Sequence, residues 1–264
     1  MKIIKNIIIW VLLIAYVIAA MSFVTEQRKK IVCNDIKVFV VDAKYNAFIT
    51  QSDIKDLLNK PGNTVLGDPI NIINTKEIED VIQKNSSVKK AEVYVTINGD
   101  VRIDVDQRNP IVRVINKRKQ SYYIDDEGTK MPLSRKYSSH VLIANGHIVE
   151  HFEVNKFNGF VCEKREENPN RNYIICDLFT LSKFIYNDDF WRSQIEQVYV
   201  NDANEFELIP RVGAHLILFG NIENYEIKFR NLKAFYEQGL NNVGWNKYEK
   251  INLKYENQII CTKR

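Results

Sequence analysis

Four histidines are the side chains of this sequence best suited to bind a metal ion: His140, His147, His151 and His215. His147 and His151 stand four residues apart, which on a helix would place both imidazoles on one face, as a zinc site needs. Asn145 and Gly146, directly before them, indicate a turn and a strand instead of a helix. No third ligand is near in sequence, so we expect no metal ion.

Three adjacent carboxylates, Asp125, Asp126 and Glu127, are the nearest approach to an acid–base pair. Adjacent residues of a strand point to opposite faces, and Gly128 marks a turn, so we expect solvated turn residues. The sequence has no glycine-rich phosphate loop, and its glycines carry no nucleophile elbow. These patterns predict no enzyme and no cofactor.

The four cysteines, Cys33, Cys162, Cys176 and Cys261, show neither the spacing of a zinc knuckle nor that of a redox pair. If the chain is exported, Cys162 and Cys176 could form a disulfide across a loop. The simpler interpretation is four unpaired and mostly buried thiols, and it is the one the sequence favours.

The net charge of +4 is spread along 264 residues, with lysine and arginine scattered and not clustered. A nucleic-acid-binding protein usually has a basic stripe together with a reading motif, and neither is visible here. We expect a solvated surface and no nucleic-acid partner. Frequent Phe and Tyr, with β-branched runs after position 88, favour β-sheet.

Residues 6–24 form an uncharged apolar run that, as a helix, would be roughly 28 Å long, close to the thickness of a bilayer core. Lys2 and Lys5 precede it and further basic residues follow it, so the flanking charges do not decide its orientation. Residues 18–20 could serve as a weak signal-peptide cleavage site. Because the run continues to Val24, we expect an uncleaved transmembrane helix between a tail at 1–5 and a linker at 25–35.

The stretch that follows predicts a small β-α-α-β-β module. Residues 36–42 are β-branched and aromatic, as in a strand, and Thr50 with Asp53 three residues on predicts a helix start. Asn74 with Glu77 announces a second helix. Strands over 88–97 and 100–107 complete the module.

The turn between these last two strands contains Asn98 and Gly99. A loop of residues 98–100 would pair Ile97 with Val101 and Val95 with Ile103. That register keeps the apolar side chains on one face of the hairpin, so it is the one we predict.

Residues 116–264 predict a second, β-rich domain with two helices, and the fold class is therefore α+β. Strands are expected near 122–125, 141–143, 195–200, 206–209 and 216–220, with helices over 173–186 and 225–236. Tyr225, Phe229, Leu232 and Tyr236 form one apolar stripe of the second helix, which we expect to face the core. Residues 251–255 and 258–262 predict a closing pair of strands.

This order of segments resembles the FtsQ/DivIB family of bacterial division proteins. The resemblance covers an N-terminal anchor, the module, the segment Gln107-Arg108-Asn109-Pro110-Ile111-Val112, the strand and turn at 122–128, and the closing sequence Ile-Asn-Leu-Lys-Tyr at 251–255. Gln107 or Asp106 replaces the usual Glu of the family, and Asn252 and Lys254 replace Asp and Arg.

The resemblance implies a POTRA (polypeptide-transport-associated) domain at 36–115 and an FtsQ-type domain at 116–264. It further implies a non-enzymatic scaffold of the divisome, crossing the cell inner membrane once, with a cytoplasmic N-terminus and a periplasmic bulk at the division septum. Such a scaffold would bind FtsB and FtsL to link and regulate septal peptidoglycan synthesis, with no small-molecule substrate.

In this family the last strand presents a free edge to the partner proteins, whose main chain adds to the sheet. By position, Tyr255 matches the final tyrosine of the family signature, and Asn257, Ile260 and Thr262 fall along the proposed edge. The competing interpretation is that they only fill the sheet, with Ile260 opposite Leu253. We expect the partner-binding role.

Two other functions stay open from the sequence. A POTRA-type chaperone of outer-membrane transport would need more strands than remain, with aromatic girdles. A secreted enzyme would follow if residues 6–24 were a cleaved signal peptide.

Overall fold

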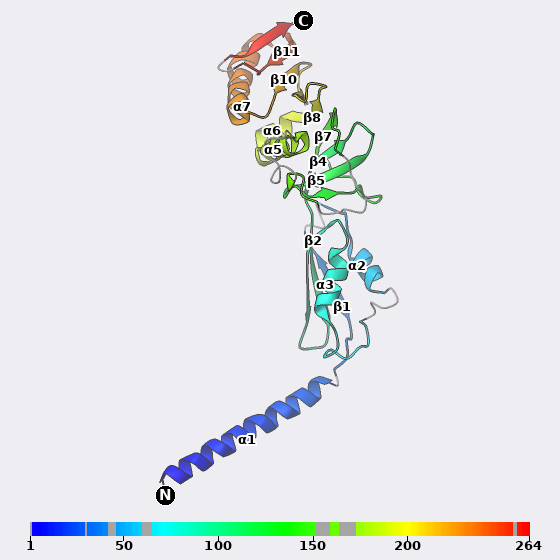
Figure 1. The fold of residues 1–264 in the computed structure, drawn as a ribbon, viewed down its shortest axis with the longest axis vertical. Helices are drawn as coiled ribbons and strands as arrows, with labels where there is room; N and C mark the ends of the chain where they lie inside the picture. Colours follow the sequence, from blue (N-terminus) through cyan, green and yellow to red (C-terminus); the bar gives the residue numbers. More distant parts are fainter. Residues whose placement is uncertain are drawn as a thin grey trace. The chain divides into compact units, whose positions relative to one another are not determined.

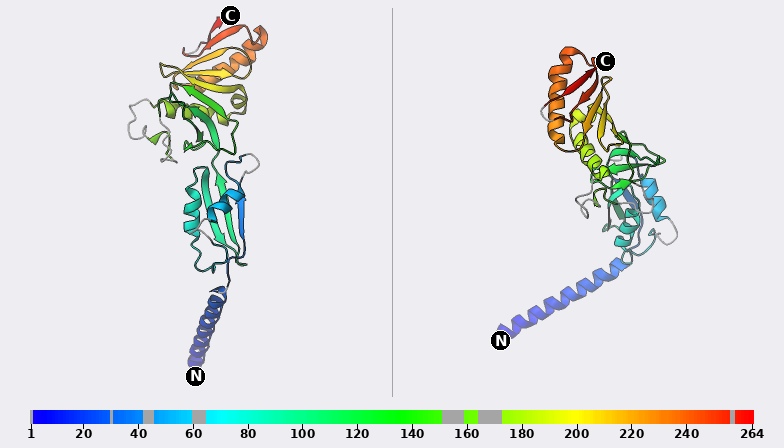
Figure 2. Two further views of the ribbon diagram at one scale, coloured as in Figure 1. Left: turned by 90° about the vertical axis from the view of Figure 1, so that its right-hand side faces the viewer. Right: turned by 45° about the horizontal axis from the view of Figure 1, so that its top comes forward.

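The computed structural model describes residues 2–29, 31–41, 46–59, 65–150, 159–163, 173–255 and 258–264, and it describes the side chains of 9–22 only within the first of these ranges. The chain divides into two compact units, Met1–Gln107 and Arg108–Arg264 (Figures 1 and 2).

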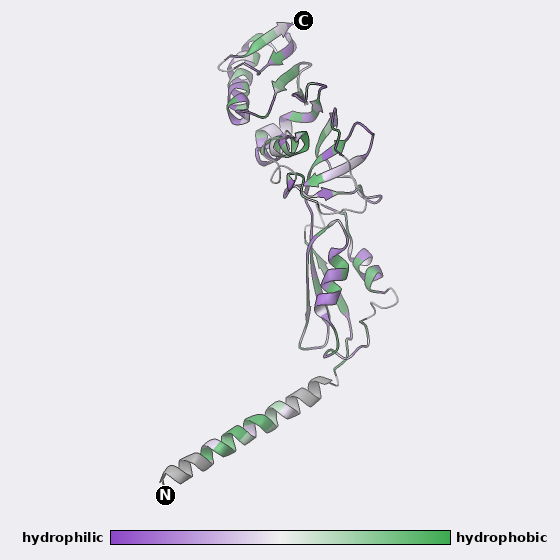
Figure 3. Cartoon of the chain, in the orientation of Figure 1, coloured by the Kyte–Doolittle hydropathy of each residue, from purple (hydrophilic) through white to green (hydrophobic). Residues whose placement is uncertain are grey.

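The first unit begins with helix α1, Lys2–Lys29. Its described side chains, from residue 9 to residue 22, are all exposed, and Figure 3 colours this stretch as largely hydrophobic. Over the residues that the structure describes, no helix meets the length and apolarity needed to cross a membrane. The transmembrane helix predicted at 6–24 is not confirmed.

After α1, the unit is a three-stranded sheet with two helices, among the residues that are described. The sheet has the order β1-β3-β2, with β1 parallel and β2 antiparallel to the central strand. The elements are β1 (Ile36–Val40), α2 (Gln51–Leu58), α3 (Thr75–Gln83), β2 (Val88–Val95) and β3 (Val101–Gln107). This order is the predicted β-α-α-β-β.

Both helices of this module start at the predicted residues. The Thr50 hydroxyl accepts from the Asp53 N–H (3.3 Å), and the Asp53 carboxylate accepts from the Thr50 N–H (2.9 Å), which is a complete capping box. Asn74 caps α3 by accepting from the Glu77 N–H (3.3 Å). Ile54 and Ile82 are fully buried against the sheet. The capping and the apolar spacing together fix the helices.

The predicted register of the β2–β3 hairpin is wrong by two residues. Val95 pairs with Val101 and Val93 with Ile103, and Ile97 is 92% exposed in the turn. Thr96 closes a longer loop, because its N–H donates to the Asp100 carbonyl (2.8 Å). A shift of two residues keeps the same side chains on the core face, so the buried set was still anticipated.

The second unit is one nine-stranded sheet with helices, as far as the structure describes it. The strand order is β12-β11-β10-β9-β8-β7-β4-β5-β6. The strands are β4 (Pro110–Ile115), β5 (Ser121–Asp125), β6 (Lys130–Met131), β7 (Leu142–Gly146), β8 (Ile195–Val200), β9 (Phe206–Pro210), β10 (Leu216–Gly220), β11 (Tyr248–Asn252) and β12 (Ile260–Lys263).

The helices of this unit are α5 (Ile174–Asn187), α6 (Asp189–Gln194), α7 (Tyr225–Ala234), the π-helix η1 (Phe235–Leu240) and the short α8 (Asn241–Val243). In Figure 1, α5, α6 and α7 lie to one side of the strands. Phe229, Leu232 and Tyr236 are at most 1% exposed and belong to the same core as Trp191, whereas Tyr225 is only partly buried. The predicted stripe is therefore confirmed at three of its four positions. Phe190 and Trp191 belong to α6, which follows α5. The side chain of Asp188 caps the N-terminus of α6.

The end of the first domain, expected at 115, differs from the division of the structure. Strand β4 pairs with β5 and β7 inside the nine-stranded sheet. Gln107 is the last residue of the first unit. Its side-chain amide donates to the Asn46 carbonyl (2.7 Å) and accepts from the Ile49 N–H (3.0 Å). The segment after Gln107 therefore starts the second sheet.

The expectation of four unpaired cysteines is wrong for one pair. Cys162 and Cys176 form a disulfide, whereas Cys33 and Cys261 carry free thiols. Cys176 lies in the first turn of α5 and packs in the core, so the bond ties the segment before α5 to the helix. Their separation of 14 residues gave no signal by itself, because pairing depends on how the chain folds back.

Removing this disulfide should destabilise the second unit. Closing a loop of this length contributes roughly 3 kcal/mol to the free energy of unfolding. We expect Cys176→Ala to lower the midpoint of urea unfolding, followed by tryptophan fluorescence, and dithiothreitol to lower it equally in the unmodified protein. Cys261→Ala, which breaks no disulfide, is the control. Equal midpoints for Cys176→Ala and the unmodified protein would contradict this role.

Candidate partner-binding edge

Strand β12 is one edge of the nine-stranded sheet. Among the described strands it pairs with β11 alone, antiparallel, with Ile260 opposite Asn252 and Thr262 opposite Lys250. The predicted position at the end of the sheet is therefore correct, and Ile260 does not lie opposite Leu253. A strand in this position keeps one row of backbone N–H and C=O groups without a partner strand.

The geometry of the ladder shows which backbone groups form that row. The Arg264 N–H donates inward to the Lys247 carbonyl (3.3 Å). Backbone groups alternate along a strand, and the register irregularity of this pair lies on β11, between Tyr248 and Lys250. The N–H and C=O groups of Cys261 and Lys263 are consequently on the outer side of β12.

The side chains of β12 divide between two faces. Ile260 is 45% exposed and Thr262 is exposed, whereas Cys261 and the preceding Ile259 pack against the core. Burial raises the pKa of the Cys261 thiol. The edge therefore presents an apolar and a hydroxyl side chain to solvent on one face, beside the free backbone row.

Tyr255 lies not on a strand but in the loop between β11 and β12, and it is 51% exposed. Asn257, the fourth predicted partner-binding residue, lies outside the described residues. The structure thus brings Ile260 and Thr262 together on the edge and places Tyr255 next to it in sequence and on the rim of a pocket.

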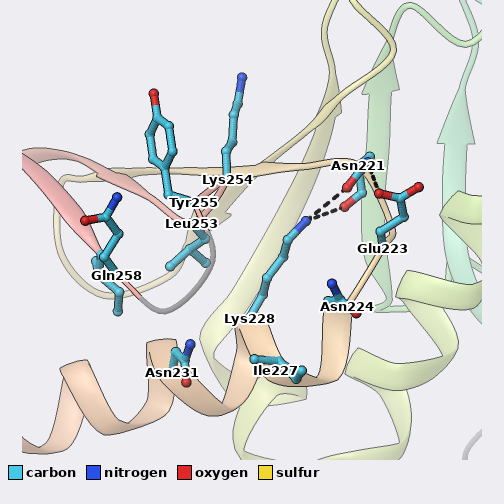
Figure 4. Close-up of a pocket in the computed structure, with 11 residues that line it drawn as sticks. Asn221, Glu223, Asn224, Ile227, Lys228, Asn231, Leu253, Lys254, Tyr255 and Gln258 are labelled. Atoms are coloured by element: carbon cyan, nitrogen blue, oxygen red, sulfur yellow. Dashed lines mark hydrogen bonds between the residues drawn. The ribbon is translucent and has the colours of Figure 1, made fainter.

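This pocket has a volume of about 290 Å³ and lies between α7 and the β11–β12 loop (Figure 4). Its wall includes Ile227, Lys228 and Asn231 of α7, with Tyr255 and Gln258 of the loop. The apolar stripe in the sequence predicts the core side of α7, whereas no local pattern indicates that its polar side lines a pocket. That side reaches the loop because β11 returns parallel to β10 after the helix.

Lys228 is the central charged group of the pocket. Its ammonium donates to the Asn221 carbonyl (2.8 Å) and to the Asn221 side-chain oxygen (3.2 Å), as Figure 4 shows, and it lies 5.0 Å from the centre of the Phe219 ring. Burial lowers the pKa of this lysine. The hydrogen-bond acceptors of this ammonium are neutral, and the carboxylates of Glu223 and Glu205 are close enough to interact with it electrostatically.

Lys254 stands on the opposite wall and forms an ion pair with Glu205. The hydrogen bond from Lys254 lowers the pKa of the Glu205 carboxyl. Leu253 anchors the start of the loop, since its side chain is buried and its N–H donates to the Leu218 carbonyl (2.9 Å). The rim beside the edge strand is therefore fixed by backbone pairing and by one ion pair.

The other chemistry-bearing residues do not converge on a site. His147 pairs with Asp202 (3.1 Å), His151 lies outside the described residues, and within the described ranges no group of three or more His, Cys, Asp and Glu could hold a metal ion. His215 is buried, and its Nε2 is 2.9 Å from the Tyr236 hydroxyl. It serves the core.

The interpretation of Asp125 as a solvated turn residue is wrong. Its carboxylate is completely buried, accepts from the Thr129 N–H (2.6 Å) and the Glu127 N–H (3.0 Å), and pairs with Arg108 (2.9 Å). Burial raises its pKa, while these hydrogen bonds and the guanidinium oppose that rise. The role of Asp125 is therefore structural: its carboxylate stabilises the β5–β6 turn.

The chain is an α+β protein in which a small β-α-α-β-β domain is followed by a nine-stranded sheet, and β12 forms one edge of that sheet. The comparison with family models finds two matches that correspond to these two parts. The family described as FtsQ/DivIB, C-terminal related, matches residues 109–262, and a POTRA-like domain matches residues 31–106. The chain belongs to the FtsQ/DivIB, C-terminal related family.

A search of curated proteins finds no match to this chain. The family membership relates the protein to bacterial cell division, with division proteins as the general class of partner and the septum as the place of action. FtsQ/DivIB and POTRA-like families are generally non-enzymatic.

The buried His215 predicts a pH dependence of stability. Its pKa is lowered, chiefly by burial, so the unfolded chain binds this proton more readily than the native chain does. The resulting stability is present above a pH of roughly 6.5 and is lost as the pH falls further. Urea unfolding at a series of pH values should show a shallower loss for His215→Gln than for the unmodified protein. His140→Gln, at an exposed position, should keep the original slope; the same slope for all three proteins would contradict the assignment.

Proposed function

We propose that this protein is a non-enzymatic scaffold of the divisome, held in the inner membrane by residues 6–24, that binds FtsB- and FtsL-type proteins through the edge of β12. In this proposal its bulk lies in the periplasm, where it links and regulates septal peptidoglycan synthesis. The observation that carries the proposal is the open edge, with Ile260 and Thr262 exposed beside the free backbone groups of Cys261 and Lys263.

The physical basis is strand addition. A partner strand supplies the missing hydrogen bonds, and alternate side chains set the specificity. Ile260 offers an apolar contact on the exposed face, and Tyr255 offers a ring on the rim of the neighbouring pocket. The pocket would receive a side chain from the part of the partner that continues past the strand, with Lys228 favouring a polar or acidic group.

Replacing Ile260 by a charged residue should weaken partner binding without unfolding the domain. The lost apolar burial and the desolvated charge should raise the Kd for an FtsB-type protein by roughly tenfold or more. We would measure this with Ile260→Glu and full-length protein in nanodiscs by biolayer interferometry. Val149→Glu, also at an exposed apolar position of the second unit, is the matched control.

Two variants of Lys263 separate backbone pairing from side-chain contact in the same assay. Lys263→Pro removes an outward N–H and should abolish binding, whereas Lys263→Ala removes only the side chain and should keep it. Full binding by Lys263→Pro, with a folded domain by circular dichroism, would reject strand addition at this edge.

The proposed anchor has its own test. Full-length protein expressed in a bacterial host should stay with the membrane after carbonate extraction, because residues 6–24 contain no charged side chain to oppose insertion. Mass spectrometry should find a chain whose first residue is Met1, with or without a formyl group, or Lys2 if the initiator methionine has been removed. A chain that starts near Met21 would instead identify a cleaved signal peptide and a released protein.

A further inference from the structure

A second pocket lies in the large sheet domain, away from β12 in the strand order. It has a volume of about 320 Å³ and lies where β4, β7 and β8 begin, beside the C-terminal half of α5. Its wall combines apolar side chains, among them Ile111, Leu142 and Ile185, with three arginines.

The arginines come from three different elements. Arg113 belongs to β4, Arg192 to α6, and Arg211 directly follows β9. Neighbouring strands and a helix thus bring together guanidinium groups that are far apart in the sequence. Arginine is the side chain best suited to bind a carboxylate through two parallel hydrogen bonds.

The three guanidinium groups differ in how many hydrogen bonds and ion pairs they already form within the protein. Arg192 pairs with Asp189 (2.5 Å) and donates to the Tyr186 carbonyl (3.2 Å), so its position is held. Arg113 donates through Nε to the Ser121 hydroxyl (3.0 Å), which leaves its terminal nitrogens available. The exposed Arg211 has no ion pair or side-chain hydrogen bond among the described residues. Two guanidinium groups therefore remain free to bind a ligand.

Ser182 of α5 gives an independent indication of a ligand. It is completely buried, it lines the pocket, and its hydroxyl has no hydrogen-bond partner within the described part of the chain. An unsatisfied buried hydroxyl costs free energy, and a native fold keeps such a group mainly where something else completes it. A ligand oxygen in the pocket would do so.

The charges around the pocket select among anions. The pocket is lined by three arginines and by Glu196, and Asp189 pairs with Arg192. The formal balance of these arginine and carboxylate groups is three positive against two negative charges, or +1. That balance suits one carboxylate better than a doubly charged phosphate, and the apolar wall suits a short hydrocarbon group beside it.

We propose that this pocket binds a carboxylate carried by a short apolar group, either the C-terminus of a small peptide or a free organic acid. Arg211 and Arg113 bind the carboxylate, and the Ser182 hydroxyl donates to it. The proposal does not depend on partner binding at β12, which uses other strands.

The test uses the full-length protein in nanodiscs with ¹³C-labelled isoleucine methyl groups. Acetyl-Ala-Ala with a free carboxylate should shift the NMR signals of the four isoleucines that line the pocket, Ile111, Ile143, Ile185 and Ile195. Ile217 and Ile251, buried elsewhere in the same sheet, should stay unchanged. The C-terminal amide of the same dipeptide should give no shifts, because it lacks the charge.

Two further probes identify the source of the carboxylate and its competitor. Propionate binding as tightly as the dipeptide would assign a free organic acid, and a clear preference for the dipeptide would assign a peptide C-terminus; both support the site. Tighter binding of inorganic phosphate, or no shift of the four pocket isoleucines at about 20 mM dipeptide, would overturn the proposal.

Variants connect the binding to the named side chains. Arg211→Gln and Ser182→Ala should each raise the Kd roughly tenfold, as expected for a lost hydrogen bond to a charged group. Ser182→Ala should not lower the unfolding midpoint, since it removes a polar atom without a partner. Arg118→Gln, at an exposed position outside the pocket, is the control. An unchanged Kd for Arg211→Gln would contradict the site.

Discussion

A β-sheet that is not closed must end in a strand whose outer backbone groups lack a partner, and this constraint shapes the second half of the protein. At one end of the nine-stranded sheet the last strand is the two-residue β6, and a strand this short leaves few backbone groups exposed. At the other end, β12 presents four residues, of which two have outward backbone groups. The position of β12 makes the edge available, and the side chains of Ile260 and Thr262 give it a face.

The rest of the domain holds that edge in place. The crossover from β10 through α7 and η1 to β11 buries Phe229 and Tyr236 against the sheet, and Leu253 continues the pairing with β10 beyond the end of β11. Cys261 of β12 and the preceding Ile259 then pack against the same core. An edge supported in this way can accept a strand without the cost of ordering its own backbone. The pocket beside it arises from the same crossover, because α7 and the β11–β12 loop flank one rim.

Local signals predicted much of this fold. Thr50 with Asp53 and Asn74 with Glu77 defined helix starts, since capping depends on residues three positions apart. The stripe from Tyr225 to Tyr236 identified a core helix from its spacing alone. A closing pair of strands was also predicted, but β11 begins three residues earlier than expected and ends at Asn252, so Tyr255 is a loop residue.

Features that depend on distant partners could not be predicted in the same way. Asp125 is buried because Arg108, 17 residues earlier, neutralises it, and no local pattern encodes that pairing. The disulfide between Cys162 and Cys176 forms because the start of α5 lies beside the segment that carries Cys162, and this proximity is not encoded locally in the sequence. The predicted hairpin register was wrong because Ile97 is apolar and was assigned to the strand, whereas it lies exposed in the turn. The pockets combine segments that only the sheet order brings together.

Amide hydrogen exchange of β12 can show whether a partner strand pairs with its outer side. We expect the amides of Cys261 and Lys263 to exchange rapidly in the free protein and to become protected when an FtsB-type protein binds, while the inward amide of Thr262 is protected in both states. Saturating binding with unchanged exchange at Cys261 and Lys263 would contradict this pairing.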